Sequence, residues 1–392
     1  MRIGMISTTR SDPWGGSEVL WADAARVALE HGHDVILSIY RWPQPATRVP
    51  ALRSQGAKVL DRPLPHRYSL IQRALRRVGR FSPFRELFHS SPDVICISQG
   101  GAYDCALDDD MMAQLYASGI PYVVICHSNN DAYIPDASMR AAAVEAFTRA
   151  SRVVFVSQRT LGTTERQLAR RLSNATVLRN PVNLRSLNAL PWPPGHTIRM
   201  AEVASLRATW KAQDILFEAL AAPAWQGRDW ILSLYGRGPD EAYLRELAAF
   251  YGLTERVHFA GYVDDVQRMW AENHLLVLPS RVESAPLALV EAMLCGRPAV
   301  VTDVGGMTEW VQEADTGYVA EAPTAQSVGA ALERAWQNRA RWPELGRRAH
   351  RVAIGRYDPV PGASLLQLLL EAARPSGIAV PRYIAGGANS TE

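Results

Sequence analysis

Lysine is almost absent from this chain of 392 residues, although arginine is abundant. Only Lys58 and Lys211 occur, so the formal net charge of +3 is carried mostly by arginine. A protein that binds nucleic acid usually has a stronger basic bias, and the charge therefore favours no partner of that class. The scarcity of lysine also makes Lys211 a residue to consider when candidate site residues are chosen.

Cysteine is scarce as well, and long apolar runs are lacking. The four cysteines have no metal-ligand spacing, and three lie in or near apolar segments, where a free cysteine packs as a small hydrophobic residue. We therefore expect a reducing compartment and no disulfides. The N-terminus shows no signal-peptide pattern, and no apolar run approaches the length of a membrane span. These features predict a cytoplasmic protein.

The composition that remains is that of a globular protein of two domains. Hydrophobic residues make up 47% of the chain and charged residues 21%, and the length exceeds that of a single ordinary core. The chain opens with an expected strand at 2–7, a loop at 8–16, a helix from about 17 to 31 and a strand at 35–40. This order is typical of nucleotide-binding sheets. The Gly15-Gly16 pair in the loop is a weak signal, because most such pairs are only turns.

A second strand–loop–helix–strand unit spans residues 275–309 and carries two unusual carboxylates. The expected helix has Pro286 in its first turn and ends at Gly296. The loop before it follows a strand of a parallel sheet, at the edge where ligands bind in open α/β sheets. Glu283 lies in this loop. Glu291 lies in the helix, which is otherwise apolar and therefore expected to be buried.

A buried carboxylate needs hydrogen-bond donors, and the residues alone leave two explanations for Glu291 open. A ribose diol would supply two hydroxyl donors, and the amides of Ser284 to Leu287 at the helix start would suit a phosphate. The other explanation is a structural glutamate held by Arg297 or another buried partner.

Several motifs together resemble one enzyme family. The spacing Glu283-x7-Glu291, the Gly-Arg-Pro segment at 296–298 and the Gly305-Gly306-x-x-Glu309 loop resemble the nucleotide half of the retaining GT-B glycosyltransferases of family 4 (glycosyl transferases group 1). The resemblance covers nearly the whole chain. It implies an α/β fold of two Rossmann-like domains that face each other across a cleft. A C-terminal helix is expected to cross back to the first domain.

The expected division follows from this resemblance and from a proline-rich stretch, Pro191–Gly195, which breaks any helix or central strand. The parts are an acceptor-side domain at 1–190, a linker at 191–195, a nucleotide-sugar-binding domain at 196–355, a crossing helix at 356–374 and a loose tail at 375–392.

The resemblance also implies roles for individual residues. His127 would lie beside the transferred sugar, although by itself a histidine at a strand end is more often a core or capping residue. Lys211 would neutralise the donor diphosphate, and Glu283 would bind hydroxyls of the sugar. These three are the expected catalytic residues. The expected donor-binding residues are Gly15, Gly16, Ser17, Ser205, Arg207, Lys211, Gly236, Arg237, Tyr262, Glu283, Ser284, Ala285, Pro286, Leu287 and Glu291.

Three positions depart from the family pattern. Ser205 stands where the family usually has arginine, with Arg207 two residues further on, and Ala212 and Ser284 stand where it usually has glycine. The expected function is a retaining transfer from a nucleotide sugar, most commonly a UDP-sugar, to a hydroxyl of a saccharide or lipid-linked acceptor in glycan biosynthesis. No metal or other cofactor is expected. The departures leave two alternatives: a catalytically impaired accessory protein that binds nucleotide or glycan, and a nucleotide-sugar epimerase of the same fold.

Two charged segments remain. The segment 62–88 holds seven arginines and one acidic residue, Glu86, with apolar residues such as Ile71 and Leu75 at helical spacing. It fits a solvated outer face, a contact with the inner face of an anionic membrane, or a rim that attracts an anionic acceptor. Asp108-Asp109-Asp110 precedes an apolar helix, where acids favour the helix dipole, and we expect a helix start there and no metal site.

Overall fold

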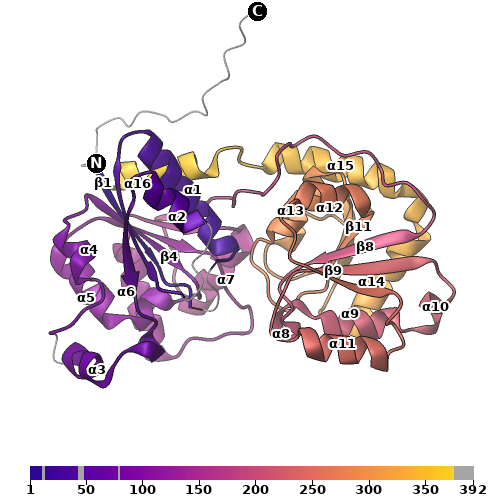
Figure 1. Ribbon diagram of the computed structural model, residues 1–392, viewed down its shortest axis with the longest axis horizontal. Helices are drawn as coiled ribbons and strands as arrows, with labels where there is room; N and C mark the ends of the chain where they lie inside the picture. The colour runs from indigo at the N-terminus through magenta and orange to yellow at the C-terminus, as the bar shows by residue number, and fades with distance from the viewer. Residues whose placement is uncertain (11–13, 43–47, 78–79, 375–392) are drawn as a thin grey trace, which may run out of the picture. The chain divides into compact units, whose positions relative to one another are not determined.

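The computed structural model describes residues 1–10, 14–42, 48–77 and 80–374 (Figure 1). The chain forms two compact units. Unit 1 contains Met1–Pro181 together with the residues from Asp358 onward, and unit 2 contains Val182–Tyr357. The tail expected at 375–392 lies outside the described residues. No helix in the described part of the chain is long and apolar enough to cross a membrane.

Unit 1 is built on a seven-stranded sheet in which every neighbouring pair is parallel. The strand order is β3-β2-β1-β4-β5-β6-β7, so the chain winds outward from β1 in both directions. The strands are β1 (Arg2–Ser7), β2 (Asp34–Tyr40), β3 (Lys58–Arg62), β4 (Val94–Gln99), β5 (Tyr122–Cys126), β6 (Arg152–Phe155) and β7 (Ala175–Val177).

Helices cover both faces of this sheet, which is why its central strands are mostly apolar. The α-helices are α1 (Gly16–Glu30), α2 (Arg48–Ser54), α3 (Leu70–Arg77), α4 (Arg85–His89), α5 (Asp109–Ser118), α6 (Ala137–Arg149), α7 (Gln158–Leu168) and α16 (Pro361–Ala372). Two short 3₁₀ turns lie at Pro65–Arg67 and Asp104–Leu107. On one face α1 and α16 lie side by side, and Ile3 and Met5 of β1 belong to their core (Figure 1). On the other face Ile95 and Ile97 of β4 join a core with Met111 of α5 and Phe147 of α6.

Unit 2 is built on a six-stranded parallel sheet of order β10-β9-β8-β11-β12-β13. The strands are β8 (Ile198–Val203), β9 (Trp230–Tyr235), β10 (Val257–Gly261), β11 (Leu275–Leu278), β12 (Ala299–Thr302) and β13 (Gly317–Ala320). The α-helices are α8 (Ala208–Lys211), α9 (Gln213–Leu220), α10 (Pro223–Gln226), α11 (Glu241–Phe250), α12 (Val266–Glu272), α13 (Leu287–Leu294), α14 (Ala325–Gln337) and α15 (Trp342–Arg356). Two 3₁₀ turns lie at Met307–Glu309 and Arg339–Arg341.

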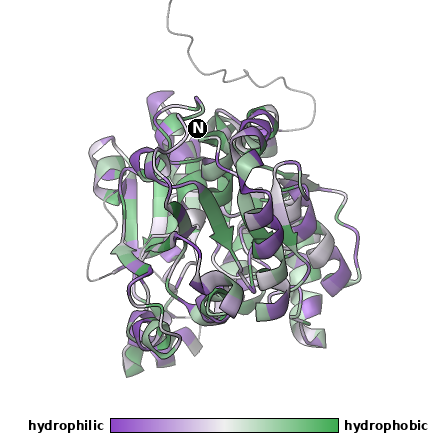
Figure 2. Cartoon of the chain, turned by 90° about the vertical axis from the view of Figure 1, so that its right-hand side faces the viewer, coloured by the Kyte–Doolittle hydropathy of each residue, from purple (hydrophilic) through white to green (hydrophobic). Residues whose placement is uncertain are grey.

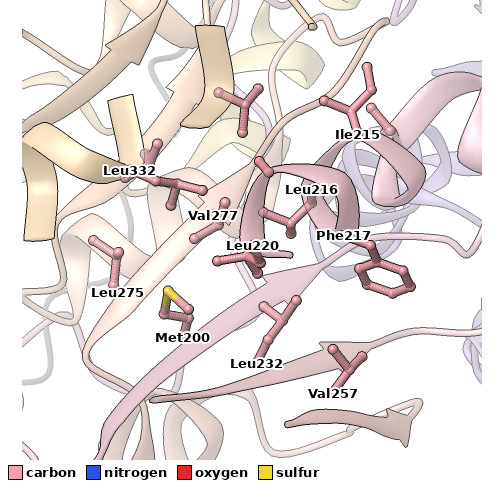
Figure 3. Close-up of a cluster of buried hydrophobic side chains, with 14 of the residues drawn as sticks. Met200, Ile215, Leu216, Phe217, Leu220, Leu232, Val257, Leu275, Val277 and Leu332 are labelled. Atoms are coloured by element: carbon pink, nitrogen blue, oxygen red, sulfur yellow. The ribbon is translucent and has the colours of Figure 1, made fainter. Parts of the chain in front are cut away.

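One core of unit 2 is formed where α9 and α14 pack on the sheet. Figure 3 shows Leu216 and Leu220 of α9 close to Met200 of β8, Leu232 of β9 and Val277 of β11. Burial of such side chains is the main stabilising term of the fold. Figure 2 shows the same pattern by hydropathy: strands are mostly green, whereas outer turns of helices carry purple residues. The prediction of an α/β protein with two Rossmann-like sheets is confirmed.

The structure divides the chain nine residues earlier than the proline-rich stretch suggested. Pro191–Gly195 lies inside unit 2, and the division falls between Pro181 and Val182. The reason is that this stretch is anchored. Arg297 is buried and donates a hydrogen bond of 2.6 Å to the backbone oxygen of Pro191, and the rings of Trp192 and His274 lie 5.4 Å apart. Proline density therefore marks an irregular segment here and not a free linker.

Candidate active site

Two loops at the carboxyl edge of the unit 2 sheet are fastened to each other. The loop after β11 donates hydrogen bonds from the amides of Arg281 and Val282 to the backbone oxygen of Trp210, at 2.8 and 3.1 Å. The Arg281 guanidinium then forms a two-point ion pair with Asp214, at 2.7 and 2.8 Å. Such bidentate pairs fix orientation as well as distance. Arg281 could not be predicted from the sequence, because only the fold brings it beside Asp214.

This fastening brings two predicted residues together. Lys211, at the end of α8, donates a hydrogen bond from Nζ to Glu283 in the loop after β11. Both side chains are largely buried, with 18% and 10% of their surface exposed. Ser280 Oγ donates to the same carboxylate oxygen at 3.3 Å. The arrangement therefore places a cation and a carboxylate next to each other in a partly water-excluded site.

Two glycines make the loop path possible. Gly305 has φ of 51°, and a Cβ atom there would lie 1.8 Å from the backbone oxygen of Glu283. Its neighbour Gly306 donates a hydrogen bond of 2.7 Å to the backbone oxygen of Ser284. A third glycine, Gly236, approaches a different loop, because a Cβ atom there would lie 1.9 Å from the backbone oxygen of Ala204. The Gly-Gly motif therefore supports the Glu283 loop from behind, by an approach that only glycine allows.

The segment Ser284 to Leu287 leads into α13, and its helix starts one residue later than expected. Pro286 is the N-cap, with φ −68° and ψ 119°, and the helix begins at Leu287. The fixed φ of proline is compatible with the N-cap position as well as with the first turn of the helix. No side chain caps this helix. Ser284 is buried and Ala285 is half-buried.

Glu291 is buried in α13 and has a protein partner. Asn183 donates two hydrogen bonds to its Oε1, from the backbone amide at 2.8 Å and from the side-chain amide at 3.0 Å. Burial raises the pKa of Glu291, and the two Asn183 bonds oppose that shift. Arg297, the partner considered from the sequence, donates instead to backbone oxygens of Trp270 and Pro191. Asn183 is a residue of this site that the sequence did not reveal.

A third carboxyl group, missed from the sequence, lies at the end of β8. Glu202 is 1% exposed, and among the described residues neither of its carboxylate oxygens has a hydrogen-bond partner within bonding geometry. Burial raises its pKa well above the usual value, although the charge of Lys211 acts in the opposite direction. Gln213, whose Nε2 donates to the backbone oxygen of Ser205 at 3.2 Å, is a neighbour. Burial therefore favours the neutral form of Glu202, which lies near the candidate site.

Ser205 and Ala212, two of the residues that depart from the family pattern, lie on either side of α8. Ala212 has φ of 60°, a left-handed conformation that favours glycine. Arg207 is the N-cap of α8, and its guanidinium lies 5.7 Å from the centre of the Trp210 ring. Ser205 is half-buried, whereas Arg237 and Tyr262 are exposed, the latter by 67%. Among the described residues, no hydrogen bond or ion pair joins the side chain of Arg237 or Tyr262 to Lys211 or Glu283.

In unit 1, His127 follows β5 directly and is 8% exposed. Its Nε2 lies 3.0 Å from Ser98 Oγ at the end of the neighbouring strand β4. Within the described residues its Nδ1 has no hydrogen-bond partner. Burial lowers the pKa of His127 to about 3, so the ring is neutral. The unpartnered Nδ1 is itself buried, and a neutral ring can donate or accept a hydrogen bond there.

The other predicted residues of unit 1 lie at the start of α1. Gly15 is the N-cap with an extended backbone, and Gly16 is exposed. Ser17 Oγ donates to the carboxylate of Glu18, which also accepts from Ser7 Oγ at 3.1 Å. Glu18 is 3% exposed, and burial raises its pKa.

The arginine-rich segment is only partly a surface. Arg62, its first arginine, is 2% exposed: it donates to the backbone oxygens of Ser7 and Ser38, and it lies between the rings of Tyr40 and Phe84 at 4.3 and 4.6 Å. It therefore belongs to the core, a correction to the interpretation of 62–88 as one exposed stretch. Val78, part of its apolar spacing, lies outside the described residues. Asp108 is the N-cap of α5 and accepts from the Met111 amide, which confirms the expected helix start.

Two family models match the chain in succession. Residues 14–186 match "Glycosyltransferase Family 4", and residues 199–338 match "Glycosyl transferases group 1". The chain belongs to glycosyltransferase family 4. The second matched range includes Lys211 and Glu283.

Relatives and solved structures agree with this assignment. The chain is 39% identical over 97 residues to N-acetyl-alpha-D-glucosaminyl L-malate synthase of Bacillus anthracis, which spans 25% of this chain and 26% of that protein. It is 29% identical over 215 residues to phosphatidyl-myo-inositol mannosyltransferase of Mycobacterium leprae, 52% and 55% of the two chains. The aligned parts thus span less than two thirds of either relative.

A solved structure covers the chain almost completely. HepE (Alr3699) of Anabaena, determined in complex with UDP, superposes with a TM-score of 0.74 at 18% identity and covers 95% of this chain and all of that one. Sucrose-phosphate synthase of Thermosynechococcus elongatus gives a TM-score of 0.73 at 17% identity, over 95% and 99%. At these identities the likeness shows the fold, and the GT-B fold class predicted from the sequence is confirmed.

Proposed function

We propose that this protein is a retaining, metal-independent glycosyltransferase that moves a sugar from a UDP-sugar to a hydroxyl of a saccharide or lipid-linked acceptor in glycan biosynthesis. The observation that carries the proposal is the contact of Lys211 with Glu283 at the carboxyl edge of the unit 2 sheet. Nucleotides bind at that edge in open α/β sheets.

The chemistry explains why this pair is suited to the reaction. In the transfer, the bond from the sugar C1 to a phosphate oxygen breaks, the acceptor oxygen bonds to C1, and the hydroxyl proton is released. Negative charge therefore builds on the departing diphosphate, and a cation that is already oriented stabilises it without reorganisation. Lys211 supplies that cation. Glu283, once Lys211 turns to the diphosphate, accepts hydrogen bonds from sugar hydroxyls.

The remaining predicted residues take supporting roles in the proposal. Glu291 would accept hydrogen bonds from the ribose through the capacity that Asn183 leaves, and the amides of Ser284 to Leu287 would receive phosphate oxygens. Gly15, Gly16 and Ser17 would complete the donor site, and His127 would bind a hydroxyl of the transferred sugar. The solved complexes of HepE with UDP and with UDP-glucose support the choice of a uridine nucleotide.

Thermal unfolding with UDP, GDP, ADP or dTDP tests the donor class first. A ligand at about a hundred times its dissociation constant stabilises the native state by roughly 2.7 kcal/mol. We expect UDP to raise the Tm of the wild type more than the other nucleotides do, and to raise that of Glu291→Ala much less. No shift with any nucleotide would favour the accessory-protein alternative. Conversion of a UDP-sugar to its epimer without acceptor would favour an epimerase.

A contact of unit 1 with an anionic membrane is a further part of the proposal. Leu70 and Ile71 at the start of α3 are 79% and 72% exposed, and Arg73 lies on the same short helix. Apolar residues beside arginines are typical of helices that lie on such membranes. We expect the protein to sediment with vesicles that contain phosphatidylglycerol, and the variant Leu70→Ser/Ile71→Ser to stay in solution. Equal sedimentation of both would remove this part of the proposal.

A further inference from the structure

The side chain of Arg281 joins the two helices that flank Lys211. Its Nη1 atom donates to the backbone oxygen of Ala208 in α8 at 2.6 Å and to Asp214 in α9 at 2.7 Å, and its Nη2 atom donates to the second oxygen of Asp214 at 2.8 Å. Lys211 is the last residue of α8, and Ala212 is the single residue between the two helices (Figure 1). One guanidinium therefore bonds to both sides of the junction at which Lys211 lies.

Local backbone preference does not explain the shape of this junction. Helix α8 is a single turn of four residues, and an isolated helix of that length is unstable in water. Ala212 has φ of 60° and ψ of 34°, a left-handed conformation that alanine disfavours. Contacts from other loops therefore fix the direction in which α8 ends, and with it the direction of Lys211.

These contacts are made at both ends of α8. At its start, the amide of Ala208 donates to Asp240 at 2.8 Å. At its end, the backbone oxygen of Trp210 accepts from the amides of Arg281 and Val282, at 2.8 and 3.1 Å. The two backbone bonds at the helix end do not depend on the guanidinium. The Arg281 side chain is thus the part of this anchoring that a substitution can remove while the two loops stay joined.

Glu283, the partner of Lys211, is held by other contacts. Ser280 Oγ donates to Oε1 of Glu283 at 3.3 Å, and the backbone oxygen of Ser280 accepts from Thr302 Oγ1 at 2.7 Å. None of these bonds involves the guanidinium of Arg281. Loss of that guanidinium should therefore displace the lysine and leave the carboxylate in place.

We propose that Arg281 is a positioning residue, whose guanidinium bridges α8 and α9 and thereby holds Lys211 against Glu283. Its effect on transfer rests on the proposed function, in which the ammonium group must be oriented towards the departing diphosphate before the reaction begins. The charge of the guanidinium is balanced by Asp214, and both of its terminal nitrogens already bond to the two helices. Arg281 therefore acts through Lys211 and not as a second cation on the substrate.

The presence of only two lysines in the chain allows the position of Lys211 to be measured directly by NMR. In protein labelled with ¹³C-lysine, the substitution Lys58→Arg removes one ε-methylene signal and so identifies that of Lys211. Lys58 has a side chain that is 53% exposed, and its signal serves as the reference for an exposed lysine. We expect Arg281→Gln and Arg281→Lys to move the Lys211 signal towards that of Lys58. Arg348→Gln is the control and should leave the signal unchanged, because Arg348 also bonds to two carboxylates of unit 2, each at 2.6 Å.

Transfer kinetics test whether this position matters for catalysis. We expect Arg281→Gln to lower kcat by about 10- to 100-fold, as a small misplacement of a catalytic group does. Arg281→Lys should lower it nearly as much, because lysine keeps the charge but lacks the fork that bonds to both helices. When Lys211→Ala is already present, adding Arg281→Gln should have little further effect on kcat, since the residue through which Arg281 acts is absent. Arg348→Gln should keep the wild-type kcat.

Each outcome decides the proposal. An unchanged Lys211 signal in both Arg281 variants overturns it, and so does a wild-type kcat in Arg281→Lys, which would show that charge alone suffices. A full further loss of kcat when Arg281→Gln is added to Lys211→Ala also overturns it. If Arg281→Gln does not fold, Arg281→Lys provides the same measurements. If the wild type transfers no sugar from UDP-sugars, the proposed function fails, and the Lys211 signal still decides whether Arg281 positions the lysine.

Discussion

Asn183 holds Glu291 by two hydrogen bonds to a single carboxylate oxygen, at 2.8 and 3.0 Å. The two residues are 108 positions apart in the sequence. The carboxylate therefore has a structural role in unit 2 whether or not a nucleotide is bound. Any ribose contact uses acceptor capacity that remains after Asn183 has been satisfied, because a carboxylate has room for about four hydrogen bonds.

This dual role predicts different results for two substitutions of Glu291. Glu291→Ala leaves both Asn183 donors without an acceptor and should reduce the free energy of unfolding by about 1–3 kcal/mol. Glu291→Gln keeps an acceptor oxygen for Asn183, so its stability should stay near that of the wild type while its affinity for UDP falls. Urea unfolding and UDP titration measure the two effects. Equal UDP affinity in Glu291→Gln and wild type would contradict a ribose contact by the carboxylate.

The chain has two lysines, and Lys58 provides the control for substitution of Lys211. Lys211→Ala removes the cation beside Glu283 and should lower kcat for transfer by about 10²–10³-fold, as loss of a preorganised charge stabiliser does. Lys58→Ala removes an exposed lysine that forms an ion pair with Glu86 at 2.9 Å, and it should leave kcat unchanged. Release of UDP from UDP-sugar measures both. Equal rates in the two variants would argue against any role of Lys211 in catalysis.

Substitution of Gly305 should displace the Glu283 loop. Gly305→Ala places an alanine in the left-handed conformation, which costs about 1–2 kcal/mol of stability. The new Cβ atom would also collide with the backbone oxygen of Glu283. Gly252 has φ of +69° with nothing within 4 Å of an added Cβ, so Gly252→Ala measures the conformational cost alone. We expect the Gly305 variant to lose more stability than the Gly252 variant and to bind UDP more weakly. If the two variants lose the same stability, the loop adjusts without cost.

Glu202 predicts an unusual dependence of stability on pH. Its native pKa is raised, so the native state keeps a proton that the unfolded chain loses above about pH 4.5. Stability is therefore lost as pH rises towards the native pKa, at up to about 1.4 kcal/mol per pH unit. Glu202→Gln should remove this slope and be more stable than wild type at neutral pH. The exposed Glu218→Gln is the control, and unfolding free energies between pH 5 and 8 give the comparison. A parallel slope in Glu202→Gln would show that another group causes it.

For His127 we expect the free energy of unfolding to change with pH in the opposite direction. Its native pKa is about 3, against 6.5 for the ordinary group. Between these values the unfolded chain binds a proton that the native state does not, so stability falls as pH falls, by up to about 1.4 kcal/mol per unit. His127→Gln should be less sensitive to acid than the wild type, and the exposed His196→Gln should not be. Urea unfolding from pH 4 to 7 tests this. An activity profile that changes near pH 6.5 in wild type and loses that change only in His127→Gln would contradict a neutral His127.

Local patterns predicted more of the fold than of the site. Buried parallel strands read as continuous apolar runs, and Asp108 as a helix start, because these depend on neighbours in the sequence. Asn183, Arg281 and Glu202 were not predicted, because their partners come from other strands and helices. The interpretation of Arg62 as surface failed for the same reason: two aromatic rings and two backbone oxygens from other segments surround it.

The position of α16 has a consequence for synthesis of the chain. This helix buries Leu365, Leu366 and Leu369 in unit 1, and the Gly362 amide donates to Asp23 of α1 at 3.2 Å. All of unit 2 is translated between α1 and α16. At about 5–20 residues per second, the ribosome needs on the order of ten seconds or more to translate unit 2, so α16 is made at least that long after the first part of unit 1. During that time the apolar groove beside α1 stays open to chaperones, so the domain that is made first is the one that finishes folding last.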